Sequence, residues 1–275
     1  MNPDIKSDFV EVEKVKLHYL HAGKGDPILL IHGFPTSSYL WRNIISELKD
    51  QFHVIAIDLP GYGKSDKNIS DSFSFRYYSR IITGFLDQLK LDKITLGVHD
   101  VGGPIGLYWM VKNMQKVENL ILFNTLVYPK FSWAVKLFGL ATVTPFLKDW
   151  LTSPSGIKKA MKLGVFNDQK LNSGDFEAYQ APFYEKGNRK VLLKSVQRLS
   201  LKGFQEIEEK LHSFKGPIQV IYGEKDKILP NVGKTMKRVQ ENLPQTKIES
   251  IPNCGHFLQE DEPKKISRIM RDFLT

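Results

Sequence analysis

The stretch ITLGVHDVGGPIGLYWM, residues 94–110, decides the fold of this chain. The apolar residues before its polar centre predict a buried strand, and those after it predict a helix. Between them, Asp100, Gly102 and Gly103 predict a sharp turn. A turn that follows a strand in an open α/β sheet lies where such sheets bind their ligands. Asp100 is therefore the first candidate for a functional side chain.

An aspartate in this turn offers a chemistry that a serine does not. Its carboxylate is ionised at neutral pH without help from a base. It can displace a leaving group from an alkyl carbon and so form an ester with the enzyme. The competing interpretation is structural, because Asp is common in turns, where its short side chain bonds to nearby backbone. The rest of the sequence decides between the two.

The remaining pattern predicts a parallel sheet covered by helices. Two alternating segments near the start predict a pair of strands, and later continuous apolar runs predict buried strands. The predicted strands cover residues 9–12, 16–20, 27–31, 53–57, 94–97, 119–124, 216–223 and 247–251. The predicted helices cover 38–49, 75–89, 104–110 and 232–243, with a final helix that runs through residue 273. This alternation is typical of an α/β fold with helices on both faces of the sheet.

The alternation stops between residues 128 and 212, where the sequence is polar, helical in pattern and without a strand. An insertion of this length after the sixth strand predicts a helical cap over the carboxyl ends of the strands. We therefore expect a core formed by residues 1–127 and 213–275, with a cap formed by 128–212.

Composition excludes several classes of protein. The chain has 275 residues, of which 41% are hydrophobic and 25% charged, as in a globular protein with a full core. Its net charge of +9 is spread over many lysines and forms no basic block interleaved with aromatic residues, so we expect no nucleic-acid partner. A single cysteine, Cys254, excludes an intrachain disulfide and suits a reducing compartment.

The location of the protein is also an expectation from the sequence. The N-terminal residues lack the basic and apolar regions of a signal peptide. The longest apolar stretch, around residues 137–146, is too short to span a bilayer. We expect a cytoplasmic protein without a membrane partner, and the pattern leaves its oligomeric state open.

Four further motifs carry a resemblance to a known family. They are HGFPTSSYLWR at 32–42, DLPGYGKS at 58–65, AYQAPF at 178–183 and GHFLQE at 255–260. Together with the Asp100 turn, they make the chain similar to the α/β-hydrolases that include haloalkane dehalogenases and epoxide hydrolases. The resemblance covers nearly the whole chain and implies the α/β-hydrolase fold, with a mostly parallel eight-stranded sheet and a cap inserted after strand six. The absence of G-x-S-x-G argues against an ordinary serine esterase.

The resemblance implies a catalytic triad. Asp100 would be the nucleophile, and His256, in the loop after the last strand, would activate the water that hydrolyses the ester. Asp226 would orient His256 and stabilise the imidazolium. Glu224 is its nearest competitor, and the segment after the sixth strand, residues 124–127, holds no carboxylate.

The resemblance is less complete at the groups that would stabilise the negative charge of the reaction. The backbone N–H groups of Phe34 and Val101 would form the oxyanion hole. In haloalkane dehalogenases a Trp usually follows the nucleophile and binds the halide, whereas Val101 has no side-chain donor. Phe34 likewise stands where that family often has Asn, which leaves Trp133 and Trp150 in the cap as candidate halide donors.

Epoxide opening needs a proton donor instead, and Tyr179 and Tyr184 are the candidates by location. The chain lacks the Asn-x-Tyr-Arg context of the epoxide hydrolase cap. Aromatic side chains would also bind an apolar substrate, and the candidates are Trp41, Trp133, Tyr179, Phe183, Tyr184 and Phe257.

The sequence therefore predicts a hydrolase that acts on a small apolar epoxide or haloalkane through Asp100, with the epoxide favoured because of Val101. A dehalogenase with other halide donors, an ester or lactone hydrolase, and a ligand-binding protein on the same scaffold are the alternatives. No nucleotide-binding or metal-binding spacing is present, so we expect no cofactor and no metal, with water as the co-substrate.

Overall fold

Eight strands form one sheet in the order β1-β2-β4-β3-β5-β6-β7-β8 in the computed structural model, which describes residues 2–275. The two N-terminal strands pair antiparallel, and every pairing from β4 to β8 is parallel. The strands are β1 (Lys6–Val12), β2 (Val15–Ala22), β3 (Pro27–Ile31), β4 (His53–Ile57), β5 (Ile94–Asp100), β6 (Val117–Thr125), β7 (Ile218–Gly223) and β8 (Thr246–Ile251). All seven residues of β5 are buried, as its continuous apolar run predicts for a central parallel strand.

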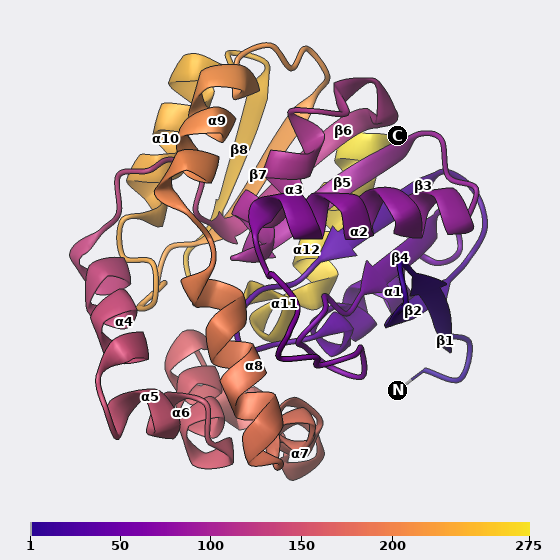
Figure 1. Cartoon of the computed structure of the whole chain (residues 1–275). Coiled ribbons are helices and arrows are strands. Elements are labelled where there is room, and N and C mark those ends of the chain that lie inside the picture. Colours follow the sequence, from indigo (N-terminus) through magenta and orange to yellow (C-terminus); the bar gives the residue numbers. More distant parts are fainter. Residues whose placement is uncertain (1) are drawn as a thin grey trace.

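Helices cover both faces of the sheet. Figure 1 shows α2 and α3 in front of it and α12 behind it, where α12 packs with α1. The core helices are α1 (Arg42–Leu48), α2 (Phe75–Gln88), α3 (Gly102–Met110), α10 (Val232–Asn242), α11 (Leu258–Asp261) and α12 (Pro263–Leu274), with short 3-10 turns η1 (Ser38–Trp41) and η2 (Met114–Lys116). The predicted α/β-hydrolase fold is confirmed.

The segment between β6 and β7 contains only helices and the loops that join them. It contains α4 (Trp133–Val143), α5 (Leu147–Leu151), α6 (Pro154–Gly164), η3 (Asp168–Lys170), α7 (Ser173–Gln180), η4 (Ala181–Phe183), α8 (Lys186–Gln197) and α9 (Leu201–Leu211). Side chains cap the starts of several of these helices, and Ser132, Ser153 and Ser200 each accept a bond from a first-turn N–H.

Helices α4 to α8 gather at one end of the molecule, whereas α9 lies away from them beside α3 (Figure 1). Phe204 of α9 packs edge-on against Phe75 of α2, with ring centroids 5.5 Å apart. The predicted cap range, 128–212, thus includes one helix that packs on the core. Among residues 2–275, we find no helix with the length and apolar character needed to cross a membrane.

A buried polar bridge joins cap and core. The Arg42 guanidinium donates to both Glu260 oxygens, at 2.6 and 2.9 Å, and to Asp175 of α7 at 2.8 Å. Tyr179 of the same cap helix also donates its hydroxyl to Glu260. Two carboxylates thus share one buried cation, which fixes α7 over α1 and α11.

Candidate active site

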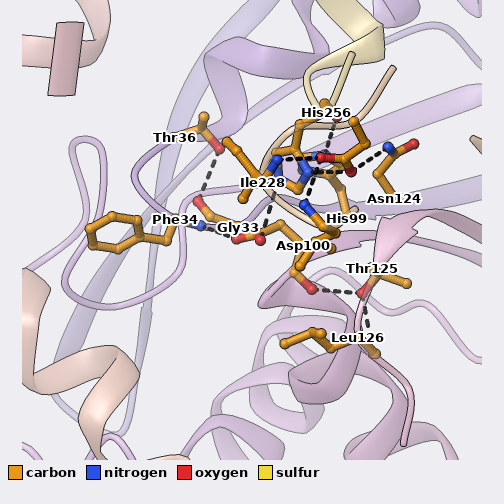
Figure 2. Close-up of polar contacts among 12 residues, drawn as sticks. Gly33, Phe34, Thr36, His99, Asp100, Asn124, Thr125, Leu126, Ile228 and His256 are labelled. Atoms are coloured by element: carbon orange, nitrogen blue, oxygen red, sulfur yellow. Dashed lines mark hydrogen bonds and ion pairs between the residues drawn. The ribbon is translucent and has the colours of Figure 1, made fainter. Parts of the chain in front are cut away.

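Asp100 ends β5 in a strained backbone conformation. Its φ is 51°, in the left-handed region that costs free energy for any residue with a side chain. Gly102 makes the turn possible, because a Cβ there would lie 2.2 Å from the His32 carbonyl oxygen. The Thr125 hydroxyl donates to the Asp100 carbonyl at 2.6 Å and holds the turn from the neighbouring strand (Figure 2). The carboxylate is thereby fixed at the carboxyl end of the sheet.

The loop after β3 meets this carboxylate. The Phe34 N–H donates to Asp100 Oδ1 at 2.7 Å. Gly33 leaves room for that approach, because a Cβ there would stand 2.3 Å from the same oxygen. Burial raises the pKa of Asp100, but the charge of His256 and the Val101 N–H outweigh it, so this pKa lies below 3.8. The structure thus brings both predicted oxyanion donors to the carboxylate.

His256 lies between the carboxylates of Asp100 and Asp226, and Figure 2 shows its side chain together with that of Asp100. Its Nδ1 is 2.9 Å from Asp226 Oδ2, and its Nε2 is 3.4 Å from Asp100 Oδ2. The ring is fully buried. Burial lowers the pKa of His256, but the two carboxylates outweigh burial and raise it to about 10. The resting site therefore holds an imidazolium between two carboxylates, with Asp100 ionised.

Asp226 is held by backbone and side-chain donors. The N–H groups of Ile228 and Leu229 donate to its Oδ1 at 2.8 and 2.7 Å. Asn124 Nδ2 donates to its Oδ2 at 2.6 Å. Burial raises the pKa of Asp226, but the His256 charge and these donors lower it below 3.8. The competitor Glu224 is exposed and accepts a bond from Ser250.

A family model described as alpha/beta hydrolase fold matches residues 26–263. The chain belongs to this family. A cis-3-alkyl-4-alkyloxetan-2-one decarboxylase of Shewanella oneidensis is 29% identical, with 98% of this chain and 88% of the relative covered. Haloalkane dehalogenase 2 of Mycobacterium bovis is 27% identical, with 95% and 92% covered.

Solved structures give the same fold. The haloalkane dehalogenase DbeA from Bradyrhizobium elkani superposes with a TM-score of 0.86 at 22% identity, over 98% of this chain and 97% of that one. The family and these named relatives show that the protein is an enzyme, a hydrolase related to haloalkane dehalogenases.

Sequence reasoning missed Asn124 as a functional residue of this hydrolase. The segment after β6 holds no carboxylate and therefore offers no candidate acid, yet Asn124 is buried and bonded directly to Asp226. Its Oδ1 also accepts the Gly223 N–H at 2.9 Å, which ties β6 to β7. A polar residue at the end of a buried strand next to β5 was the available signal.

Two buried histidines, His99 and His32, shape the site, and burial lowers the pKa of both. His99 Nε2 donates to the His256 carbonyl at 2.9 Å, and the two rings lie 4.7 Å apart. Burial and the His256 charge lower the pKa of His99 to about 3. His32 donates through Nδ1 to the Gly33 carbonyl and accepts the Leu59 N–H at Nε2. Both neutral rings hold loops that carry functional groups.

The residues predicted to bind or protonate the leaving group do not lie beside Asp100 in an available form. Trp133 is 69% exposed, Trp150 is 46% exposed and Tyr184 is 48% exposed, so these side chains lie on the outside of the cap. Tyr184 donates its hydroxyl to Glu177 there. Tyr179 is buried, but its hydroxyl belongs to the Arg42 bridge. The sequence could not predict which side of α4 faces the solvent, because this helix is apolar around most of its circumference.

The other aromatic candidates are buried. Phe257 packs edge-on against the His256 ring at 4.9 Å, and Trp41 packs against Phe123 at 5.1 Å. Phe183 is also buried. Burial raises the pKa of Cys254 to about 12, so its thiol stays protonated. Among residues 2–275 no group of three His, Cys, Asp or Glu side chains could hold a metal ion.

Proposed function

We propose that this hydrolase forms an alkyl ester on Asp100 and hydrolyses it with water activated by His256. The observation that carries the proposal is the Asp100 carboxylate, with one oxygen on the Phe34 N–H at 2.7 Å and the other facing His256 at 3.4 Å. A low pKa keeps this carboxylate ionised, as a nucleophile requires. The substrate class is a small apolar molecule with an electrophilic alkyl carbon.

The first step needs no proton transfer from the nucleophile, because Asp100 is already ionised. Asp100 Oδ2 attacks the alkyl carbon, the bond from that carbon to the leaving group breaks, and the leaving group takes the electron pair. Oδ1 stays on the Phe34 N–H and becomes the carbonyl oxygen of the ester. Esterification also removes one of the two negative charges beside His256, so the pKa of His256 falls and the ring can lose its proton.

The second step uses the same donors. His256 Nε2 takes a proton from water, and the water oxygen attacks the ester carbon of Asp100. The N–H groups of Phe34 and Val101 stabilise the tetrahedral oxyanion, and Asp226 stabilises the imidazolium that forms. The bond between Asp100 Cγ and Oδ2 then breaks, and the alcohol leaves with Oδ2 and with the proton that His256 took from water.

A ring oxygen is the leaving group that the described side chains fit best. Val101 and Phe34 offer no side-chain N–H to a halide, and the cap tryptophans are exposed. The buried Tyr62 hydroxyl stands at the boundary of cap and core, where it accepts from Ser195 of α8 at 2.7 Å. Burial and the charge of Asp100 raise the pKa of Tyr62, so its proton is retained. We propose Tyr62 as the donor to an opening epoxide.

Replacing one hydroxyl tests this assignment. Tyr62→Phe keeps the ring on His32 but removes the proton donor. We expect epoxide alkylation of Asp100 to slow by about a hundredfold, a typical contribution of general acid catalysis, while a haloalkane is unaffected. Tyr78→Phe, which removes a buried hydroxyl bonded to Pro60, is the matched control. Equal slowing in both variants would remove Tyr62 from the mechanism.

An oxetan-2-one is the second candidate substrate, supported by the name of the Shewanella oneidensis relative and by the lack of halide donors. Asp100 would attack ring carbon C4, and the breaking C4–O bond would leave a carboxylate on C3. Loss of that carboxylate as CO₂ would supply the electron pair of a C3–C4 double bond and expel Asp100 as a carboxylate. This route consumes no water, so it does not need His256 as a base.

The His256→Gln variant separates the candidates, because glutamine cannot take the proton from water. We expect intact mass spectrometry to show a trapped ester after incubation with the right electrophile. A gain equal to the whole epoxide indicates ring opening, and a gain of an alkyl group without halogen indicates dehalogenation. Alkene release from a cis-dialkyl oxetan-2-one by this variant indicates decarboxylation.

The double variant Asp100→Asn, His256→Gln is the control, and it should gain no mass with any substrate. If His256→Gln gains no mass and releases no alkene while wild-type protein converts a simple carboxylic ester, alkyl transfer to Asp100 is wrong.

A further inference from the structure

The outer face of the cap is apolar. Four side chains of α4 follow one another at helical spacing on its exposed side, and three more continue the face through α5. We call this set the cap face: Trp133, Leu137, Leu140, Val143, Phe146, Leu147 and Trp150, all exposed. Phe146 is 88% exposed and has a φ of 62°, an unfavourable backbone for an aromatic residue. A monomeric protein rarely leaves such a contiguous patch to water.

Positive charge is concentrated in the part of the cap sequence that contains this apolar face. Residues 128–170 contain seven lysines and two aspartates, a formal +5 out of the chain's +9. Lys136 and Lys148 lie within the segment of the cap face and Lys130 lies three residues before it, and none of the three has an ion-pair partner among residues 2–275. Apolar and aromatic side chains bordered by lysines are the composition of helices that lie in the interface of an anionic membrane.

The inner side of α4 leads to the active site. Phe138, on the side away from the cap face, packs edge-on against Phe34 with ring centroids 5.2 Å apart. Phe34 in turn supplies the N–H that holds Asp100. One helix therefore separates the apolar outer surface from the oxyanion loop.

We propose that the cap face docks on the surface of an anionic lipid bilayer, from which an apolar substrate can reach Asp100 past α4. A second copy of the chain fits this face less well, because pairing two such faces would bring their lysines together. The expectation of no membrane partner was drawn from the lack of a spanning segment, and docking at the surface needs none. Docking itself does not depend on the chemistry of Asp100; only the delivery of substrate rests on the proposed function.

Vesicle binding tests the proposal directly. The full-length protein is mixed with phosphatidylcholine vesicles or with vesicles that contain roughly one third phosphatidylglycerol, at about 0.05 M and about 0.5 M salt. We expect co-sedimentation with the anionic vesicles at low salt and a loss of about tenfold or more at high salt. Fluorescence should shift to the blue, because Trp133 and Trp150 are exposed whereas Trp41 and Trp109 are already buried.

Charge placed on the cap face should abolish binding. Leu140→Glu and Phe146→Glu replace exposed side chains, so the fold should be retained, as circular dichroism would show. Leu201→Glu changes a side chain of α9 that is 54% exposed and outside the cap face, and it should bind like wild type. Asp100→Asn should also bind normally, which separates docking from catalysis.

Three results would overturn the proposal. They are equal binding by the cap-face variants and Leu201→Glu, no binding of wild type to anionic vesicles at low salt, and a dimer in sedimentation velocity that Leu140→Glu dissociates. The last result would assign the cap face to a second copy of the chain.

Discussion

His256 lies between Asp100 and Asp226, and this position couples the charge of His256 to the charge of Asp100. In the free enzyme the two carboxylates raise the pKa of His256 to about 10. An ester on Asp100 is neutral, so only Asp226 still raises this pKa. One histidine is thus protonated in the resting enzyme and available as a base after alkylation, without a change in geometry.

This coupling predicts different pH dependences for the two steps. Because the pKa of Asp100 is below 3.8, we expect the rate of alkylation to be flat between about pH 5 and 9. Hydrolysis should accelerate as the pH rises through the pKa of His256, which the loss of the Asp100 charge lowers, because the neutral ring is the base. Rapid quench and mass spectrometry would show ester accumulating at low pH and disappearing at high pH. An ester fraction independent of pH would contradict His256 as the base.

At the scale of elements, the loop between β3 and η1 sets the position of the Asp100 carboxylate. A Cβ on Gly33 would lie 2.3 Å from Asp100 Oδ1, so Gly33→Ala must push the loop or the carboxylate away. Loss of an oxyanion donor typically costs about a hundredfold in kcat, and we expect a loss of this size in the rate of alkylation and hydrolysis. Gly139→Ala in α4, where nothing lies within 4 Å, should leave both rates unchanged. Similar rates in the two variants would remove the loop from catalysis.

The elements differ in how far their sequence predicts them. β5 and α3 can be predicted from local pattern, because a continuous apolar run followed by two glycines is compatible with few structures other than a buried strand, a turn and a helix. The position of α9 does not, because its packing against α2 and α3 depends on contacts such as Phe204 with Phe75 that are distant in sequence. In the site, Asp100 could be found from its turn. The bond of Asn124 to Asp226 joins residues 102 positions apart, and no local pattern shows it.

At the scale of the whole molecule, the Arg42 bridge holds the cap on the core. Arg42→Leu would leave Glu260 and Asp175 buried without their cation. We expect the free energy of unfolding to fall by about 3–5 kcal/mol, the cost of breaking a buried pair from one side. Urea unfolding measures this loss. Arg80→Leu removes an exposed partner of Glu13 and should cost less than about 1 kcal/mol. Equal losses would show that the bridge contributes no more than a surface pair.

The central claim is that an oxygen of Asp100 becomes part of the product, and a single turnover in water enriched in oxygen-18 tests it most directly. With enzyme in excess over an electrophile that alkylates it, we predict an alcohol product without oxygen-18 and one oxygen-18 atom in the Asp100 carboxylate, located by peptide mass spectrometry. An alcohol that carries oxygen-18 after the first turnover, with an unlabelled Asp100, would show that water attacks the substrate directly and would contradict the account.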